Sequence, residues 1–171
     1  DNKLESNVGI IETTVVDLSK MSLLGNAVTS NTLMHPGHTI GEYRNLSAFA
    51  ALRTNGSVVT WGDSASGGNS STVASQLDGT VDVVQVFSTW GAFAALRTDG
   101  SVVTWGGSTY GGNSSTVASQ LDGTVDVVQV FSTNYAFAAL RTDGSVVTWG
   151  SGNYGGNSST VASQLDGTVD V

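Results

Sequence analysis

Few residues in this sequence could bind a metal ion or activate a nucleophile. Both histidines lie in the stretch HPGHTIGEY, where His35, His38 and Glu42 supply two imidazoles and a carboxylate, a set that suits zinc. The alternative is a Pro-Gly turn that carries exposed histidines. We favour the turn, because the stretch offers no fourth ligand. The sequence therefore predicts no metal site and no cofactor.

Aspartates recur in the stretch LDGTVD, which occurs three times and supplies six of the fourteen acidic residues. Asp78 and Asp82, with their copies, could bind a hard cation through oxygen ligands. A turn followed by a solvated acid explains the same pattern, and we favour it, because no aspartate-rich loop of calcium-binding spacing occurs. Serine is plentiful, but there is no G-x-S-x-G motif and no base within the repeats to activate a serine. We therefore expect a protein that is not an enzyme.

The composition argues against several classes of partner. The net charge is −8 with only six Lys and Arg residues, and an acidic chain without a basic cluster is a poor match for nucleic acid. No apolar run approaches the roughly 18 residues of a membrane span, so we expect no membrane insertion. The chain opens without Met or a signal-peptide pattern, which predicts a mature form or a fragment.

A stretch of fifteen residues, AFAALRTNGSVVTWG at 48–62, recurs at 92–106 and at 136–150 with only Asn55 replaced by Asp. The tryptophan of this stretch therefore recurs every 44 residues. A period of about 40–50 residues with strand-forming content indicates β-propeller blades, because helical repeats would show an apolar period of about 3.6 residues. We predict an all-β chain built from propeller blades.

Each repeat contains three predicted strands, which in the second copy are 83–89, 92–98 and 101–106. Asp99-Gly100 separates the last two and predicts a type I′ hairpin turn, in which both central residues have a positive φ. Apolar residues occupy both parities of these strands, as expected for a sheet that is buried on both faces. The segment STVASQLDGTVD that follows is either a helical turn capped by Ser115 and followed by a short edge strand, or the outer strand of a four-stranded blade. We favour the helical turn.

The repeat resembles that of the regulator-of-chromosome-condensation family, whose units run strand, A-L-x-x-D-G, strand, W-G and then a Gly-containing loop. The resemblance covers about residues 39–171 and implies four-stranded blades, about seven to a propeller. Members of that family include a nucleotide-exchange factor, parts of ubiquitin ligases and a secreted β-lactamase inhibitor, so the fold alone assigns no function. The matching residues in the first copy are Ala51-Leu52, Asn55-Gly56, Trp61-Gly62 and Gly67.

Two departures from that family pattern stand out. The family's usual histidine before Ala-Leu is replaced by alanine, and its usual G-Q-L-G loop reads GGNS here. The alanines are Ala48, Ala92 and Ala136.

The repeats divide the chain into blades at 39–82, 83–126 and 127–171, with TIGEYRN (39–45) at the place of the first strand. Residues 1–38 are either a decayed fourth blade or a separate N-terminal segment. Three blades fall below the roughly four to eight of closed propellers. We therefore expect a fragment, or self-association in which other copies complete the array.

The copies differ mainly in two short patches, one after Trp-Gly and one just before the AFAAL strand. Strand alternation places both patches at the same end of a blade, opposite the hairpin turns. Their aromatic residues are types that anchor interfaces, so we favour a binding surface over drift in tolerant loops. The predicted partner-binding residues are Asp63, Ser64, Ala65, Ser66, Trp90, Gly91, Ser108, Thr109, Tyr110, Asn134, Tyr135, Asn153 and Tyr154.

Together these features predict a non-enzymatic β-propeller module that binds a protein or a glycan through the loops of one face. The alternative is a structural assembly subunit, a homo-oligomer or filament that completes its blade array with other copies. The acidic, Cys-free composition rich in Ser, Thr and Gly favours a secreted or cell-surface protein.

Overall fold

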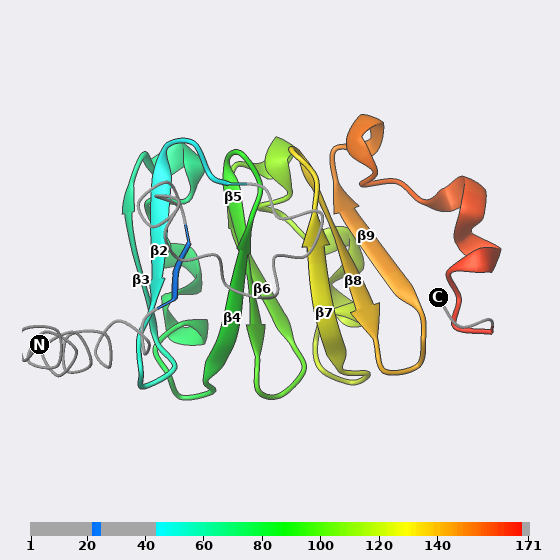
Figure 1. Ribbon diagram of the computed structural model, residues 1–171, viewed down its shortest axis with the longest axis horizontal. Coiled ribbons are helices and arrows are strands. Elements are labelled where there is room, and N and C mark those ends of the chain that lie inside the picture. The colour runs from blue at the N-terminus through cyan, green and yellow to red at the C-terminus, as the bar shows by residue number, and fades with distance from the viewer. Residues whose placement is uncertain (1–21, 25–43, 169–171) are drawn as a thin grey trace, which may run out of the picture.

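The computed structural model describes residues 22–24 and 44–168 and shows three three-stranded sheets that stand side by side in chain order (Figure 1). Each sheet is antiparallel, and strands consecutive in sequence are neighbours. The predicted all-β array of propeller blades is confirmed. We call the sheets, with the helices that follow them, blade 1, blade 2 and blade 3. Their strands are β1 (Ser22–Leu24), β2 (Ala48–Leu52), β3 (Val58–Gly62), β4 (Val83–Ser88), β5 (Ala92–Arg97), β6 (Val102–Gly106), β7 (Val127–Ser132), β8 (Ala136–Arg141) and β9 (Val146–Gly150).

Two short 3₁₀ helices follow the third strand of every blade, and the second of each pair is the predicted helical turn. None of the described helices is long and apolar enough to cross a membrane. The helices are η1 (Ser64–Ser66), η2 (Ser71–Gln76), η3 (Ser108–Tyr110), η4 (Ser115–Gln120), η5 (Gly152–Tyr154) and η6 (Ser159–Gln164).

Two details of this segment were predicted wrongly. Ser114 is the N-cap residue, Ser115 begins η4, and the backbone N–H of Ser115 donates to Asn113 Oδ1 at 2.9 Å. The expected edge strand is reduced to single pairings, such as the bond from Val102 N to Leu121 O at 2.9 Å. The described sheets therefore keep three strands instead of the four that the family resemblance implies.

The first strand of blade 1 comes from earlier in the chain than predicted. β1 pairs antiparallel with β2, and Leu23 lies opposite Ala51. Residues 44–45 of the stretch expected to form this strand are not in a strand, and its residues 39–43 lie outside the described residues. The stretch HPGHTIGEY (35–43) also lies outside the described residues. Apart from β1, residues 1–38 also lie outside, so their assignment as a blade or a separate segment stays a prediction.

The hairpin turn of each blade depends on one glycine and on the side chain before it. Gly100 has a φ of +73°, whereas no described residue other than glycine has a positive φ, so the predicted type I′ turn is wrong. The loop instead has three residues and ends in a left-handed glycine, a common hairpin form. Asp99 Oδ1 accepts hydrogen bonds from Ser101 N at 3.1 Å and from Ser101 Oγ at 2.6 Å. Asn55 Oδ1 accepts the same pair from Ser57, so the one change within the fifteen-residue repeat preserves the turn.

Adjacent blades are joined by a tryptophan of one blade and a glycine of the blade before it. Trp105 Nε1 donates to Gly67 O at 3.0 Å, and Trp149 Nε1 donates to Gly111 O at 3.0 Å. Each indole stacks on the phenylalanine opposite it in the hairpin, with ring centroids 5.3 Å apart. A Cβ at Gly67 would lie 2.7 Å from the Phe93 ring, so that ring packs directly on the glycine backbone. We call this arrangement of Trp, Phe and Gly the blade junction.

The hydrophobic core lies between the sheets. One cluster of buried side chains joins blades 1 and 2, a second joins blades 2 and 3, and each contains the tryptophan of a blade junction. The central strand β5 is covered on both faces and is buried along almost its whole length. The predicted burial on both faces is thus confirmed for the sheet of blade 2, which packs between its two neighbours, whereas the outer face of β3 in blade 1 is largely exposed.

The blade junction predicts unequal roles for tryptophans at the same repeat position. Trp105 is 2% exposed, whereas Trp61 is 43% exposed because no described blade precedes blade 1. The W105F variant should lose about 2–3 kcal/mol of unfolding free energy, because it leaves the buried Gly67 O without a donor and creates a cavity. The matched W61F variant should lose less than about 0.5 kcal/mol. Urea denaturation in dilute solution compares them, and equal losses would contradict the junction.

The hairpin aspartates predict a loss of stability in acid. Burial alone raises the pKa of Asp99, but hydrogen bonds from Ser101 and the nearby Arg97 guanidinium outweigh it, so this pKa lies below its ordinary value. Hydrogen bonds from Ser145 and the Arg141 guanidinium likewise lower the pKa of Asp143.

A carboxylate whose pKa is lower in the folded than in the unfolded state stabilises the fold above the unfolded pKa of about 4, and this stabilisation is lost as the pH falls through the folded pKa. The D99N/D143N variant keeps the turn, as Asn55 does, and should lose less stability than the wild type between about pH 5 and pH 2. Thermal unfolding over this range measures the difference. An identical acid profile in the two proteins would show that these aspartates do not contribute.

Candidate functional site

The two variable patches of each blade lie at the same end of the sheet, opposite the hairpin turn. In blade 2, Ala92 at the start of β5 pairs with Gly106 at the end of β6. The bend at Trp90-Gly91 precedes this pair and η3 follows it, so both lie at this end. The strand pairing therefore agrees with the placement predicted from strand alternation.

Four aromatic side chains from these patches gather around one tyrosine. The Tyr135 ring lies 4.9 Å from that of Tyr110, stacked at an interplanar angle of 18°. It also lies 4.3 Å from the ring of Tyr154 and 5.4 Å from that of Trp90. We call these four residues the aromatic surface. Blade 2 supplies Trp90 and Tyr110, and blade 3 supplies Tyr135 and Tyr154, so the surface spans two blades.

The backbone beneath Tyr110 holds this ring in place. A Cβ added at Gly91 would lie 2.9 Å from Tyr110 Cδ2, and one added at Gly107 would lie 2.7 Å from the same atom. The ring therefore lies directly over two glycines, where a larger residue would displace it. Thr89 Oγ1 also donates a hydrogen bond to Tyr110 O at 2.8 Å, and Thr133 makes the equivalent bond to Tyr154 O at 2.8 Å. The aromatic surface is thus built on a fixed backbone.

Backbone hydrogen bonds connect the bends of successive blades along this rim. Leu46 N donates to Trp90 O at 3.1 Å, and Trp90 N donates to Asn134 O at 3.1 Å. In blade 1 the buried Asn45 replaces the threonine found at 89 and 133 in the other blades. Its Nδ2 donates to Ser66 O at 2.7 Å and its Oδ1 accepts from Ala48 N at 2.8 Å. The three bends therefore form one continuous rim.

The other predicted partner-binding residues lie around the aromatic surface or in the blade 1 loop. In blade 1, Asp63 precedes η1, which contains Ser64, Ala65 and Ser66, and Ser66 Oγ donates to Asp63 Oδ2 at 2.7 Å. Ser108 and Thr109 lie in η3, Asn153 lies in η5, and Asn134 lies in the bend before Tyr135. Blade 1 contributes no ring to the aromatic surface. Among the described residues no group of three His, Asp or Glu side chains is placed to hold a metal ion.

Close ring packing affects the acidity of the central tyrosine. Partial burial raises the pKa of Tyr135, and the nearby Tyr110 and Tyr154 raise it further, because ionisation of adjacent hydroxyl groups would place like charges close together. Tyr135 therefore stays protonated to a higher pH than a free tyrosine. At neutral pH the surface consequently offers a neutral hydroxyl that can donate or accept a hydrogen bond.

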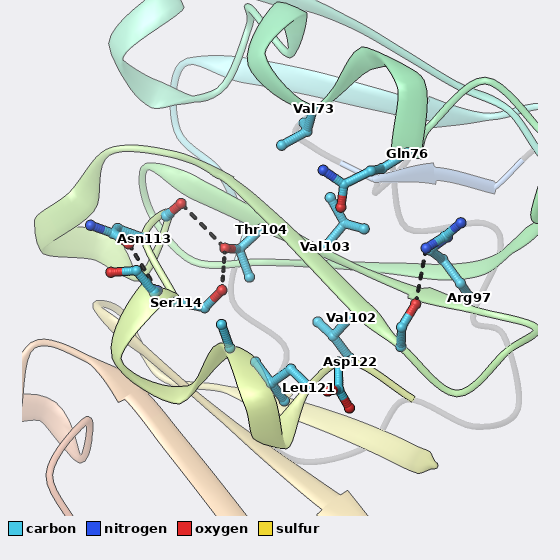
Figure 2. Close-up of a pocket in the computed structure, with 14 residues that line it drawn as sticks. Val73, Gln76, Arg97, Val102, Val103, Thr104, Asn113, Ser114, Leu121 and Asp122 are labelled. Carbon is cyan, nitrogen blue, oxygen red and sulfur yellow. Dashed lines mark hydrogen bonds between the residues drawn. The ribbon is translucent and has the colours of Figure 1, made fainter. Parts of the chain in front are cut away.

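A groove of about 490 Å³ between blades 1 and 2 was not predicted from the sequence (Figure 2). Val73 and Gln76 of η2 form one wall, and residues of blade 2 that include Val103 and Thr104 form the other. Two pairs of polar groups in the lining contact each other: Thr104 Oγ1 lies 2.9 Å from Ser114 Oγ, and Arg97 Nη1 donates to Ser101 Oγ at 3.1 Å. The buried Nε of Arg97 has no hydrogen-bond partner. The groove lies between repeats 44 residues apart, so only knowledge of how the blades pack could have revealed it.

The pKa of Tyr135 can be tested by spectroscopic titration. The ionisation of Tyr135 should lie above the ordinary value of about 10, and the Y135F variant should lack this transition. Ultraviolet difference absorbance between pH 8 and the onset of unfolding measures it. The W61F variant, which changes an aromatic residue outside the aromatic surface, is the control and should retain the transition. If Y135F retained it too, the ring cluster would not be formed as described.

Comparisons with known proteins bear on the family and the fold. The family model described as "Regulator of chromosome condensation (RCC1) repeat" matches residues 127–155. No curated protein sequence matches the chain.

Several solved structures are similar to this chain. The CRINKLY WD40 ectodomain of the receptor kinase ACR4 from Arabidopsis thaliana has 17% identity and a TM-score of 0.40, with 64% of this chain and 37% of that chain covered. Human WBSCR16 has 19% identity and a TM-score of 0.41, covering 65% and 34%. Prp20p from Saccharomyces cerevisiae has 18% identity and a TM-score of 0.47, covering 64% and 32%. The chain spans about a third of the length of these structures.

The matched segment is the sheet of blade 3 with the loop that follows it. Blade 2 carries nearly the same sequence 44 residues earlier, and blade 1 repeats its hairpin. Residues 127–155 therefore match a repeat of the regulator of chromosome condensation (RCC1) family, and blades 1 and 2 carry much of the same sequence.

Proposed function

We propose that this chain is a non-enzymatic interaction module that holds a protein partner on the aromatic surface. The observation that carries this proposal is the packing of Trp90, Tyr110 and Tyr154 around Tyr135, with ring centroids 4.3–5.4 Å from that of Tyr135. All four residues stand at positions where the repeats differ, on a frame that is otherwise nearly invariant. A repeat protein that varies only at one rim has the form of a binding scaffold.

The chemistry of the surface suits protein recognition. Trp and Tyr supply a large contact area at low cost in side-chain entropy, and each carries a polar group at the edge of an apolar ring. The ring of Tyr154 is 47% exposed, and the other three rings are partly exposed. Because the net charge of the chain is −8, a partner segment that presents Arg or Lys over these rings would gain both cation–π contacts and long-range attraction.

The RCC1-like fold implies a protein-interaction module, which is the reason for proposing a protein rather than a glycan. Among similar structures, yeast RCC1 (Prp20) is bound by Kap60, and the binding of Prp20p to Gsp1p and histones is described. Kap60, Gsp1p and histones are named there as partners of Prp20. For this chain we propose only the class of partner, which is a protein.

Two further parts of the proposal rest on the sequence and on the described residues. Non-enzymatic action is supported by the absence of a histidine from 44–168 and by serine and threonine hydroxyls that hydrogen-bond to other hydroxyls or to turn aspartates. An extracellular or cell-surface location is supported by composition alone.

The test exchanges rings of the aromatic surface for residues that the chain itself has at the same repeat position. W90L takes the residue of Leu46, and Y135S takes that of Ser47. The double variant W90L/Y135S should weaken binding of captured proteins at least about 30-fold, because each anchor residue of an interface contributes about 2 kcal/mol. Affinity capture by the immobilised chain, followed by titration of each captured protein, measures the change.

The control variant T98A/T142A alters exposed positions at the hairpin turns, at the opposite end of the sheets. It should bind as the wild type does, and circular dichroism should show all three proteins folded. Equal binding by W90L/Y135S and the wild type would reject the aromatic surface. Binding of polysaccharides but not proteins, again lost in W90L/Y135S, would replace the proposed partner by a glycan.

A further inference from the structure

The outer face of blade 1 is open, although its residues are those that blades 2 and 3 bury. Val59 and Trp61 on β3 are both 43% exposed. Their counterparts in blade 2, Val103 and Trp105, are 3% and 2% exposed. The rings of Phe49 and Trp61 already stack at 5.2 Å, as the corresponding rings do in the other two blades. Blade 1 therefore presents a preformed half of a blade junction with no described blade in front of it.

The loop side of blade 3 is the other half of a blade junction. Gly155 has a φ of +95°, close to the +97° of Gly67. A Cβ at Gly155 would meet nothing within 4 Å, whereas at Gly67 and Gly111 it would meet a phenylalanine ring at 2.7 Å. Val161 of η6 is 39% exposed, while the equivalent valines of η2 and η4 pack on the core of the next blade. In Figure 1, η6 extends from β9 with no sheet beside it.

The groove between the blades is also present in an incomplete form on blade 1. A hollow of about 360 Å³ is lined by residues of 58–60 and 68–71, which correspond to 102–104 and 112–115 of the complete groove. The wall that η2 supplies to the complete groove, through Val73 and Gln76, has no counterpart in this hollow. Helix η6 has the same sequence as η2, STVASQ, and would supply the missing wall.

These open faces lie at opposite ends of the row of blades, so they do not contact each other within one chain (Figure 1). We propose that two copies of this chain bind head to tail through them. Trp61 Nε1 of one copy donates to Gly155 O of the other, Phe49 packs on the Gly155 backbone, and Val161 covers Val59. The occupant is specified by the chain, because the same contacts already form twice between its own blades.

Two copies are the smallest assembly that leaves neither face open. Such a dimer contains two identical head-to-tail junctions and six blades, within the roughly four to eight that closed propellers use. The interface does not require Trp90 or Tyr135, so this proposal goes beyond the proposed partner binding and can fail or succeed independently of it.

The test blocks each face with a single charge at an exposed valine. Because burying an unpaired carboxylate is costly, V59D and V161D should each raise the concentration at which half of the protein is dimeric by at least about a hundredfold. Analytical ultracentrifugation of the full chain should find a mass near twice 17.5 kDa for the wild type and near 17.5 kDa for either variant. Val84 on β4 is a matched control, because it is 51% exposed and lies away from both faces. V84D should dimerise as the wild type does.

A mixture of the two variants provides a second, more specific measurement. V59D retains an unaltered Gly155 face and V161D retains an unaltered Trp61 face, so their mixture should form a one-to-one dimer, held by the single junction that contains neither aspartate, that neither variant forms alone. Circular dichroism should show both variants folded. The proposal is overturned if the wild type stays monomeric at every concentration. It is also overturned if V59D and V161D dimerise as the wild type does, or if their mixture contains only monomers.

Discussion

The blade junction is the interaction on which the rest of this structure depends. A three-stranded sheet that is apolar on both faces cannot stand alone in water, so each sheet must be covered by its neighbours. The junction specifies how this happens: an indole N–H donates to the carbonyl of a left-handed glycine in the previous blade, and a phenylalanine packs where that glycine has no side chain. The hydrogen bond fixes the register between blades, and the buried Trp and Phe rings belong to the core cluster between them.

This constraint explains why the repeated residues are constant and why the rim can vary. Trp105 and Gly67 must match across a boundary between repeats, so neither can change alone. The bend at 90–91 and the loop at 107–110 lie at the end of the blade, where they contact each other and the next rim. They can therefore change without disturbing the junction, and they carry the aromatic surface.

Much of the fold could be predicted from the sequence, because its signals are local. The hairpin follows from strand-forming runs on either side of Asn/Asp-Gly, although the number of loop residues, and with it the turn type, depends on the strand register. Strand alternation was sufficient to place both variable patches at one end. What could not be predicted was how segments far apart in the sequence meet. The groove and the contact of Tyr135 with Tyr110 depend on packing between blades, and the pairing of β1 with β2 joins segments that no local signal connects. The prediction of an edge strand was wrong because STVASQLDG turns instead of extending, which leaves only isolated backbone pairings with the sheet.

The most direct test of the junction is hydrogen exchange of the tryptophan indole N–H groups, followed by nuclear magnetic resonance in dilute solution. The indole protons of Trp105 and Trp149 are buried and donate to a glycine carbonyl, so they should exchange only when the blades separate. The indole proton of Trp61, at the same position of an uncovered blade, should exchange much faster. Slow exchange at positions 105 and 149 with fast exchange at 61 is the result that this account predicts. Equal exchange at all three positions in a monomeric sample would contradict it.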